Sequence, residues 1–204
     1  MSFAETIKSK PRLKKFVHWL LVPKNEARPR ISTILFVNPF FHKHGRGAII
    51  RGHARIDVFP FYKFRLGKHS TIEDFCCINN GVGDVIIGND THIGISNMIS
   101  GPVTIGNNVI LAQNICLSGL NHGYADVTLP IHKQKVSTAT ITIEDECWLG
   151  SNVVVAAGVT IGKHSVIGAG SVVTKSIPPY CLAVGNPARV IKTYDFDKKE
   201  WVRC

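Results

Sequence analysis

Between residues 66 and 173 an aliphatic residue recurs every six positions, in three runs of constant phase. The runs are Leu66, Ile72 and Ile78; Ile87, Ile93, Ile99, Ile105, Leu111 and Leu117; and Ile143, Leu149, Val155, Ile161, Ile167 and Val173. A helix would place apolar residues three and four apart, and a half-buried strand would alternate. A six-residue period is instead typical of a parallel β-helix. The pattern therefore predicts an all-β solenoid.

Three hexapeptides, about 18 residues, would form one triangular coil, so the pattern predicts about five coils. They would begin at Leu66, Ile87, Ile105, Ile143 and Ile161. We expect the aliphatic side chains to point inward and to stack on the same side in neighbouring coils. Glycine often follows the aliphatic residue, and this suits a corner that needs either a positive φ or the absence of a Cβ atom. Cys76 and Cys147 occupy the small inward position, four residues after the aliphatic one.

The period is interrupted twice. A short insertion surrounds residues 81–84, and the step from Leu117 to Ile143 is 26 residues, eight more than one coil. Insertions in repeat proteins collect on one face and often contain functional residues. We therefore expect the chemistry in the excursion over residues 118–142.

Charge is distributed unevenly along the chain. Residues 1–55 contain twelve Lys/Arg and two Asp/Glu, whereas residues 56–204 contain twelve of each sign. We therefore divide the chain into a basic N-terminal segment (1–60), a β-helix (61–178) and a C-terminal extension (179–204). Within the extension, residues 194–201 are expected to form a short helix.

The basic segment includes an amphipathic pattern that Pro23 ends. Its apolar face comprises Leu13, Phe16, Val17, Leu20 and Leu21. One interpretation is a helix that caps the open end of the solenoid. The other is a basic helix, residues 10–24, at an anionic membrane surface. Nucleic acid is not expected as a partner, because no recognition motif accompanies the charge.

Composition also bears on the compartment. No apolar stretch reaches the roughly 20 residues of a membrane-spanning helix, and the first residues do not read as a secretory signal. The six cysteines lack metal-type spacing, so we expect reduced thiols. These features favour a cytoplasmic protein, with the inner membrane surface as an alternative location.

Several motifs resemble one family. They are Trp148–Asn152, Gly158–Gly162, Gly168–Lys175, Ile177–Pro179 and Gly185–Arg189. Over residues 60–193 the chain resembles the hexapeptide-repeat acyltransferases, in the branch of galactoside, maltose, nodulation and colanic-acid O-acetyltransferases. The resemblance implies a left-handed parallel β-helix and a homotrimer with active sites between subunits. It also implies acetyl-CoA as the donor, no metal, and a saccharide acceptor used in polysaccharide biosynthesis.

Acyl transfer to a hydroxyl needs a base that removes the hydroxyl proton, and histidine suits this near neutral pH. The resemblance places the catalytic base at His122, at the start of the excursion. His132 is a weaker candidate in the same loop. The expected acceptor contacts are Asn97, Asn121, Tyr124 and Trp148. A corner or ladder role explains Asn97 equally well, and loop-fixing hydrogen bonds explain Tyr124, Asp126 and Gln134. Asn79 and Asn80 are weaker candidates.

The donor site implied by the resemblance combines small corner residues with cations for the phosphates. These positions are Ser151, Ala169, Thr174, Lys175, Arg189 and Lys192. Arg and Lys recognise phosphate as a bidentate fork and as a point charge, respectively. Solvated surface charge is the alternative explanation for Lys175, Arg189 and Lys192.

Three other functions remain open. The first keeps the donor and acetylates the amine of an amino sugar or an antibiotic. The second is a γ-type carbonic anhydrase-like zinc lyase, which would need three converging histidines. His69, His92, His122 and His164 are scattered along the sequence and do not form that pattern. The third is a non-catalytic scaffold, which His122 and the donor-site motifs argue against.

Overall fold

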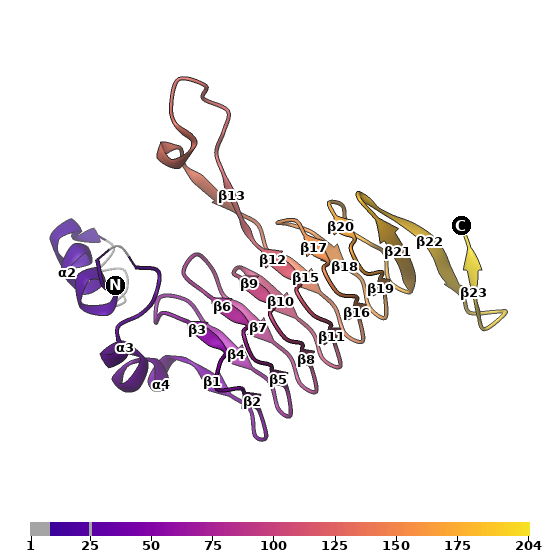
Figure 1. Ribbon diagram of the computed structural model, residues 1–204, viewed down its shortest axis with the longest axis horizontal. Coiled ribbons are helices and arrows are strands. Elements are labelled where there is room, and N and C mark those ends of the chain that lie inside the picture. The colour runs from indigo at the N-terminus through magenta and orange to yellow at the C-terminus, as the bar shows by residue number, and fades with distance from the viewer. Residues whose placement is uncertain (1–8, 25) are drawn as a thin grey trace.

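A computed structural model describes residues 9–24 and 26–204, and its main body is a parallel β-helix with three faces (Figure 1). Sheet A contains β1 (Lys43–His44), β4 (Phe64–Leu66), β7 (Val85–Ile87), β10 (Val103–Ile105), β15 (Ile141–Ile143) and β18 (Thr160–Ile161). Sheet C contains β3 (Arg55–Asp57), β6 (Cys77–Asn79), β9 (Met98–Ser100), β12 (Cys116–Ser118), β17 (Val154–Val155) and β20 (Val172–Val173). The predicted solenoid is confirmed.

Sheet B is the longest sheet, because it continues past the last full coil. It contains β2 (Ile49–Ile50), β5 (Thr71–Ile72), β8 (His92–Ile93), β11 (Ile110–Leu111), β16 (Trp148–Leu149), β19 (Val166–Ile167), β21 (Cys181–Gly185), β22 (Ala188–Asp195) and β23 (Glu200–Arg203). Strands β2 to β21 are parallel, whereas β21, β22 and β23 are antiparallel neighbours.

The structure has six coils, one more than the predicted five. The additional coil is the first, formed by β1, β2 and β3, and it pairs in parallel with the coil from β4 to β6. His44 lies opposite Leu66, Ile50 opposite Ile72, and Ile56 opposite Ile78. A histidine replaces the aliphatic residue at the start of this coil, which hides the repeat from a search for aliphatic residues alone.

The core is the stack of inward aliphatic side chains. Each of the periodic residues from Leu66 to Val173 is buried, and Cys76 and Cys147 are buried among them as predicted. Buried hydroxyls at the small inward position are satisfied by the backbone of the next coil, as when Ser70 Oγ donates to Gly88 O at 2.7 Å. All six cysteines are free thiols.

The corner glycines are required by the close approach of neighbouring coils. A Cβ atom on Gly94 would lie 2.5 Å from Ala112 O, and one on Gly150 would lie 2.7 Å from Ala169 N. Positive φ angles occur two residues further along, at Ser96 (62°) and Asn152 (61°). Of the two explanations for these glycines, the absence of a Cβ atom is therefore the one that applies.

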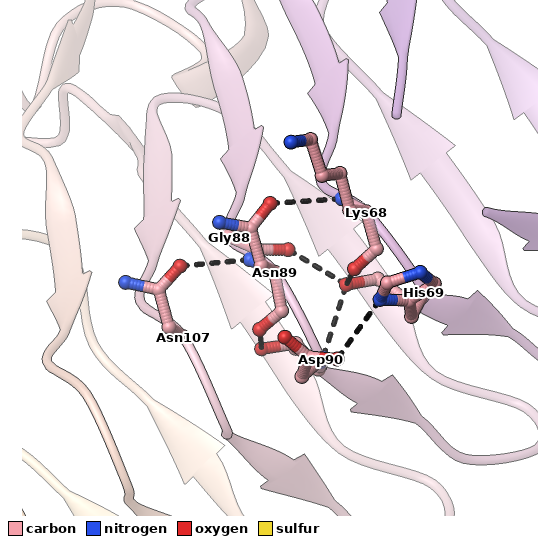
Figure 2. A network of polar contacts seen from close by, with 8 residues as sticks. Lys68, His69, Gly88, Asn89, Asp90 and Asn107 are labelled. Carbon is pink, nitrogen blue, oxygen red and sulfur yellow. Dashed lines mark hydrogen bonds and ion pairs between the residues drawn. The ribbon is translucent and has the colours of Figure 1, made fainter. Parts of the chain in front are cut away.

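Side chains also link the coils along the corner between sheets A and B (Figure 2). The Lys68 N–H donates to Asn89 Oδ1 at 2.8 Å, and the Asn89 N–H donates to Asn107 Oδ1 at 2.8 Å. The Asn107 N–H in turn donates to Asp145 Oδ1 at 2.7 Å. Because strands end here, these side-chain oxygens satisfy corner N–H groups that the sheets leave unpaired.

The predicted helix over residues 194–201 is wrong, because this segment is a β-hairpin. Strands β22 and β23 pair antiparallel, with Tyr194 opposite Trp201. The Tyr194 ring lies edge-on to Phe196 at 5.1 Å and to Trp201 at 5.6 Å between ring centroids. Cross-strand aromatic pairs of this kind stabilise a sheet, and the unpaired edge of β21 offers a partner that a helix could not use.

The described part of the N-terminal segment includes three short helices at one end of the solenoid (Figure 1). They are α2 (Pro11–Leu21), which confirms the predicted amphipathic helix, α3 (Ile31–Phe36) and α4 (Asn38–Phe41). A cavity of about 530 Å³ lies between α3, α4 and the first two coils. Among the described residues, no helix is long and apolar enough to cross a bilayer.

Candidate functional site

The excursion leaves the solenoid after β12, at the corner between sheets C and A, and projects from the coils (Figure 1). Its base is an antiparallel pair, β13 (Leu120–His122) and β14 (Val136–Thr138). A 3-10 turn, Ile131–Lys133, lies in the loop that joins these two strands. The sequence can form this pair because residue 123 is a glycine: a Cβ atom there would lie 2.6 Å from Lys135 O.

His122 is the last residue of β13, opposite Val136. Its neighbour Gly123 donates its N–H to Lys135 O at 2.9 Å, so the backbone on both sides of His122 is held by the hairpin. The side chain is exposed, and within residues 9–24 and 26–204 its ring has no hydrogen-bond or ion-pair partner. The hairpin thus fixes the backbone position of His122, and both ring nitrogens are available to a ligand.

Two other polar residues of the excursion hold the loop together. The Asp126 carboxylate accepts hydrogen bonds from the Thr128 N–H at 2.9 Å and the Thr128 hydroxyl at 2.6 Å, which lower the pKa of Asp126. Gln134 Nε2 donates to Asp126 O at 2.8 Å and to Leu129 O at 3.0 Å. Loop-fixing therefore accounts for Asp126 and Gln134. Tyr124, in the same loop, has 79% of its surface exposed.

Asn97 does not face the excursion. It is buried, its Nδ2 donates to Gly94 O at 2.7 Å and to Ala112 O at 2.8 Å, and its Oδ1 accepts the Ile115 N–H at 2.6 Å. In these three hydrogen bonds both the Nδ2 and the Oδ1 atom of Asn97 are occupied, and they join two neighbouring coils. The ladder interpretation therefore describes Asn97, and we remove it from the expected acceptor contacts.

Asn79 and Asn80, beside the short insertion, also use their side chains for hydrogen bonds with the backbone. Asn80 is buried, and its Nδ2 donates to Phe59 O at 3.0 Å and to Tyr62 O at 2.8 Å. Asn79 Oδ1 accepts the Gly81 N–H at 2.7 Å. Both side chains stabilise turns of the backbone.

The expected donor residues flank sheet C. Ser151 and Ala169 lie on successive coils at the corner between sheets B and C, where the Gly170 N–H donates to Ser151 O at 2.8 Å. Thr174 and Lys175 follow β20, at the corner between sheets C and A from which the excursion also leaves. The fold therefore places these four residues and the base of the His122 hairpin along the two edges of one face.

Ser151 has a partner that the sequence did not single out. Its Oγ donates to Gln113 Oε1 at 2.6 Å. The two residues are 38 positions apart, because the excursion separates coils that are adjacent in space. No periodic pattern could therefore have joined them.

Arg189 and Lys192 lie on β22, at the C-terminal end of the solenoid. Arg189 is opposite Val184 and donates from Nη1 to Ala188 O at 2.9 Å. Among the described residues, neither cation nor Lys175 forms an ion pair, so all three can meet an anionic group from outside the chain.

Trp148 lies on another face of the prism. It is on β16 of sheet B, between Ile110 and Val166 of the neighbouring strands, and 52% of its surface is exposed. A single chain therefore spreads the expected residues over two faces and one end. In the described part of the chain, no group of three or more His, Cys, Asp and Glu side chains could hold a metal ion.

Comparisons with known sequences find the same repeat. The family model described as bacterial transferase hexapeptide (six repeats) matches residues 140–175, the segment of β15 to β20. The galactoside O-acetyltransferase of Escherichia coli (strain K12) is 47% identical over 95 residues, which are 44% of this chain and 43% of that protein. The chain thus spans about half the length, or less, of the first curated relatives it matches.

A second relative is matched over most of its length. The putative lipopolysaccharide biosynthesis O-acetyl transferase WbbJ of Escherichia coli (strain K12) is 34% identical over 172 residues, 74% of this chain and 85% of that protein. Among solved structures, the N-acyltransferase AntD from Bacillus cereus, in complex with dTDP and 3-hydroxybutyryl-CoA, has a TM-score of 0.65. The two sequences are 22% identical, and the matched region covers 76% of this chain and 85% of AntD. At this identity the similarity concerns the fold.

Proposed function

Because this chain belongs to the hexapeptide-repeat acetyltransferase family, we propose that it transfers an acetyl group from acetyl-CoA to a sugar hydroxyl, with His122 as the general base. The acceptor would be a polysaccharide building block or a lipid-linked saccharide precursor. The observation that carries the proposal is His122 itself. His122 is the last residue of β13, which pairs with β14 at the base of the excursion. Its exposed ring forms no hydrogen bond or ion pair with another described residue.

The chemistry requires one proton to be moved twice. A neutral imidazole takes the proton of the acceptor hydroxyl as its oxygen attacks the thioester carbonyl. The tetrahedral intermediate collapses, the carbon–sulfur bond breaks, and the protonated His122 returns the proton to the departing thiolate. The products are an acetyl ester and CoA thiol, and no acetyl group is bound covalently to the protein.

The donor would lie along sheet C and its edges. Ser151, Ala169 and Thr174 offer small side chains and backbone groups to the amides of the pantetheine arm. Lys175, Arg189 and Lys192 supply cations that form no ion pair with another described residue, as phosphate recognition needs. The CoA ligands of the fold neighbour AntD are consistent with this assignment.

A homotrimer with its sites between subunits would complete this arrangement. In one chain the His122 ring lacks a described partner, and Trp148 lies on a different face from sheet C. A neighbouring subunit that presents its sheet B to the excursion would bring Trp148 to the acceptor beside Asn121 and Tyr124.

The test is thiol release from acetyl-CoA in the presence of a panel of sugars and amino sugars. We expect His122→Ala to lower kcat by roughly 10²–10⁴-fold, the usual contribution of a general base. His132→Ala tests the weaker candidate in the same loop, and a small change in kcat beside a large loss in His122→Ala would assign the base to His122. Undiminished turnover by the His122 variant would reject the mechanism.

A second candidate keeps the site and changes the acceptor to an amine. AntD, which shares the fold, is described as an N-acyltransferase. The product distinguishes the two functions, because hydroxylamine cleaves an acetyl ester and leaves an amide intact. Turnover restricted to amino sugars, with a hydroxylamine-stable product, would favour the amine acceptor.

A further inference from the structure

The N-terminal helices touch the solenoid through few side chains. We call residues 9–24 and 26–42 the helical arm. Leu21 is the one buried side chain of α2, and it packs with Val22 against Phe59. Further along the arm, Asn38 Nδ2 donates to Val58 O at 2.8 Å. Of the apolar face expected for α2, Val17 and Leu21 pack near Phe59, whereas Phe16 and Leu20 are exposed. Helix α2 therefore covers the end of the solenoid with only part of that face.

The arm instead leaves large apolar side chains in water. The exposed fraction reaches 72% at Phe36 and 85% at Phe40. The full set is Phe16, Trp19 and Leu20 of α2; Ile31, Ile34, Leu35 and Phe36 of α3; and Phe40 and Phe41 of α4. Single exposed apolar residues are ordinary, but nine within three short consecutive helices mark an interaction surface.

The same part of the chain is strongly basic. Residues 9–42 contain seven Lys/Arg and a single acidic residue, Glu26, whereas residues 56–204 contain twelve of each sign. None of the seven forms an ion pair with a described residue. The Arg30 guanidinium lies over the Trp19 ring, 5.6 Å from its centroid, so a cation and an exposed aromatic are directly adjacent.

We propose that the helical arm binds the surface of an anionic lipid bilayer. Its aromatic and aliphatic side chains would enter the interface between headgroups and acyl chains, and its lysines and arginines would meet lipid phosphates. Helix α2 has 11 residues, which suits a helix lying in the plane of the surface. Binding would combine two attractions, apolar burial and charge, each of which is weak alone.

The charge favours lipid over the other occupants of such a surface. A second copy of the arm would bring two basic surfaces together and would be repelled. A nucleic acid would match the charge but would leave the nine apolar side chains exposed to water. An anionic bilayer satisfies both features.

The experiment is co-sedimentation of the full chain with vesicles. We expect binding to phosphatidylcholine vesicles that contain 30% phosphatidylglycerol, at least tenfold weaker binding to pure phosphatidylcholine, and release in 0.5 M NaCl. The double variant Phe36→Gln/Phe40→Gln and the double variant Lys14→Glu/Lys15→Glu should each bind at least tenfold more weakly. The matched controls Phe196→Gln and Lys133→Glu/Lys135→Glu should bind like the parent.

A fluorescence measurement keeps the test valid if an arm variant is unstable. In the protein with Trp148→Phe and Trp201→Phe, Trp19 is the remaining tryptophan, and its emission should shift to the blue on adding anionic vesicles. The proposal is overturned if the unmodified protein does not bind anionic vesicles. It is equally overturned if arm and control variants bind alike, or if the Phe36/Phe40 variant changes the oligomeric state while vesicle binding is unaffected.

Discussion

At the scale of single residues, His42 is the clearest case of a group whose chemistry is set by its surroundings. It lines the cavity between the arm and the first coil, and its Nε2 is buried with no partner among the described atoms. Burial, with a smaller contribution from the neighbouring His44, lowers the pKa of His42 from 6.5 to about 4. The folded protein therefore holds a neutral imidazole at neutral pH.

This shift makes stability depend on pH in a defined direction. Between about pH 4 and 6.5 the unfolded chain binds a proton at His42 that the folded chain does not, so stability is full above pH 6.5 and falls as the pH is lowered through that window. We expect a loss of about 1 to 3 kcal/mol by pH 4. His42→Asn should flatten this part of a curve of unfolding free energy against pH.

The control for this prediction is His132→Asn, which removes an exposed histidine. It should leave the slope between pH 4 and 6.5 unchanged. Equal slopes for the parent and the His42→Asn protein would show that His42 is not the source of the dependence.

At the scale of elements, the corners decide how closely the coils stack. Gly94 lies on the corner after β8, where an added Cβ would be 2.5 Å from Ala112 O and 2.8 Å from Leu111 O. The backbone of a packed coil cannot move away without breaking its ladder of hydrogen bonds. A glycine here is thus a packing requirement.

We expect Gly94→Ala to lower the free energy of unfolding by about 1 to 3 kcal/mol, because overpacking against backbone forces the coils apart. Gly52→Ala is the matched control, since nothing lies within 4 Å of the position of its Cβ. Denaturant unfolding of the two variants measures the difference. Equal stabilities would argue against close coil approach as the reason for the corner glycines.

The elements that the sequence misassigned have a common cause. In the first coil His44 interrupts the aliphatic pattern, although Ile50 and Ile56 follow it at intervals of six residues. In the C-terminal extension, the apolar residues of β22 and β23 are compatible with either a helix or a hairpin. The free edge of β21 decides in favour of the hairpin, and a free edge is a property of the assembled sheet.

At the scale of the whole molecule, the three faces differ in the character of their outward side chains. On sheet A the outward residues Arg65, Thr104 and Thr142 are polar, and Ile86 between them is apolar. On sheet B, Ile110 and Trp148 lie side by side with about half of each side chain exposed. Sheet C also exposes Met98 and Val154, each to a lesser extent, so the pair on sheet B favours that face as a contact between subunits.

The homotrimer proposed from the family resemblance would have a mass of about 67 kDa, three times 22.4 kDa, by light scattering coupled to size exclusion. Ile110→Glu should reduce this mass toward that of one chain and should reduce acetyl transfer with it. Thr104→Glu, which places the same charge on an outward position of sheet A, should leave both unchanged. A trimer that tolerates Ile110→Glu would exclude sheet B as the contact.

The amino-acid sequence by itself determined the solenoid, the inward residues and the place of the excursion. It could do so because a β-helix repeats one local geometry, and the same side chain is needed at each repeat. The resemblance added His122 and the donor residues as expectations, and the fold places most of these along the edges of sheet C.

Tertiary structure decided what the repeat could not encode. It shows a first coil before Leu66 and a hairpin over residues 188–203. It also shows that Asn97 forms three hydrogen bonds with the backbone, and that Ser151 bonds to Gln113, on the other side of the excursion in sequence. Each depends on a partner that lies in another coil or on the free edge of a sheet. The period is local in sequence, whereas hydrogen-bond partners, free edges and exposed faces exist only once the coils are stacked.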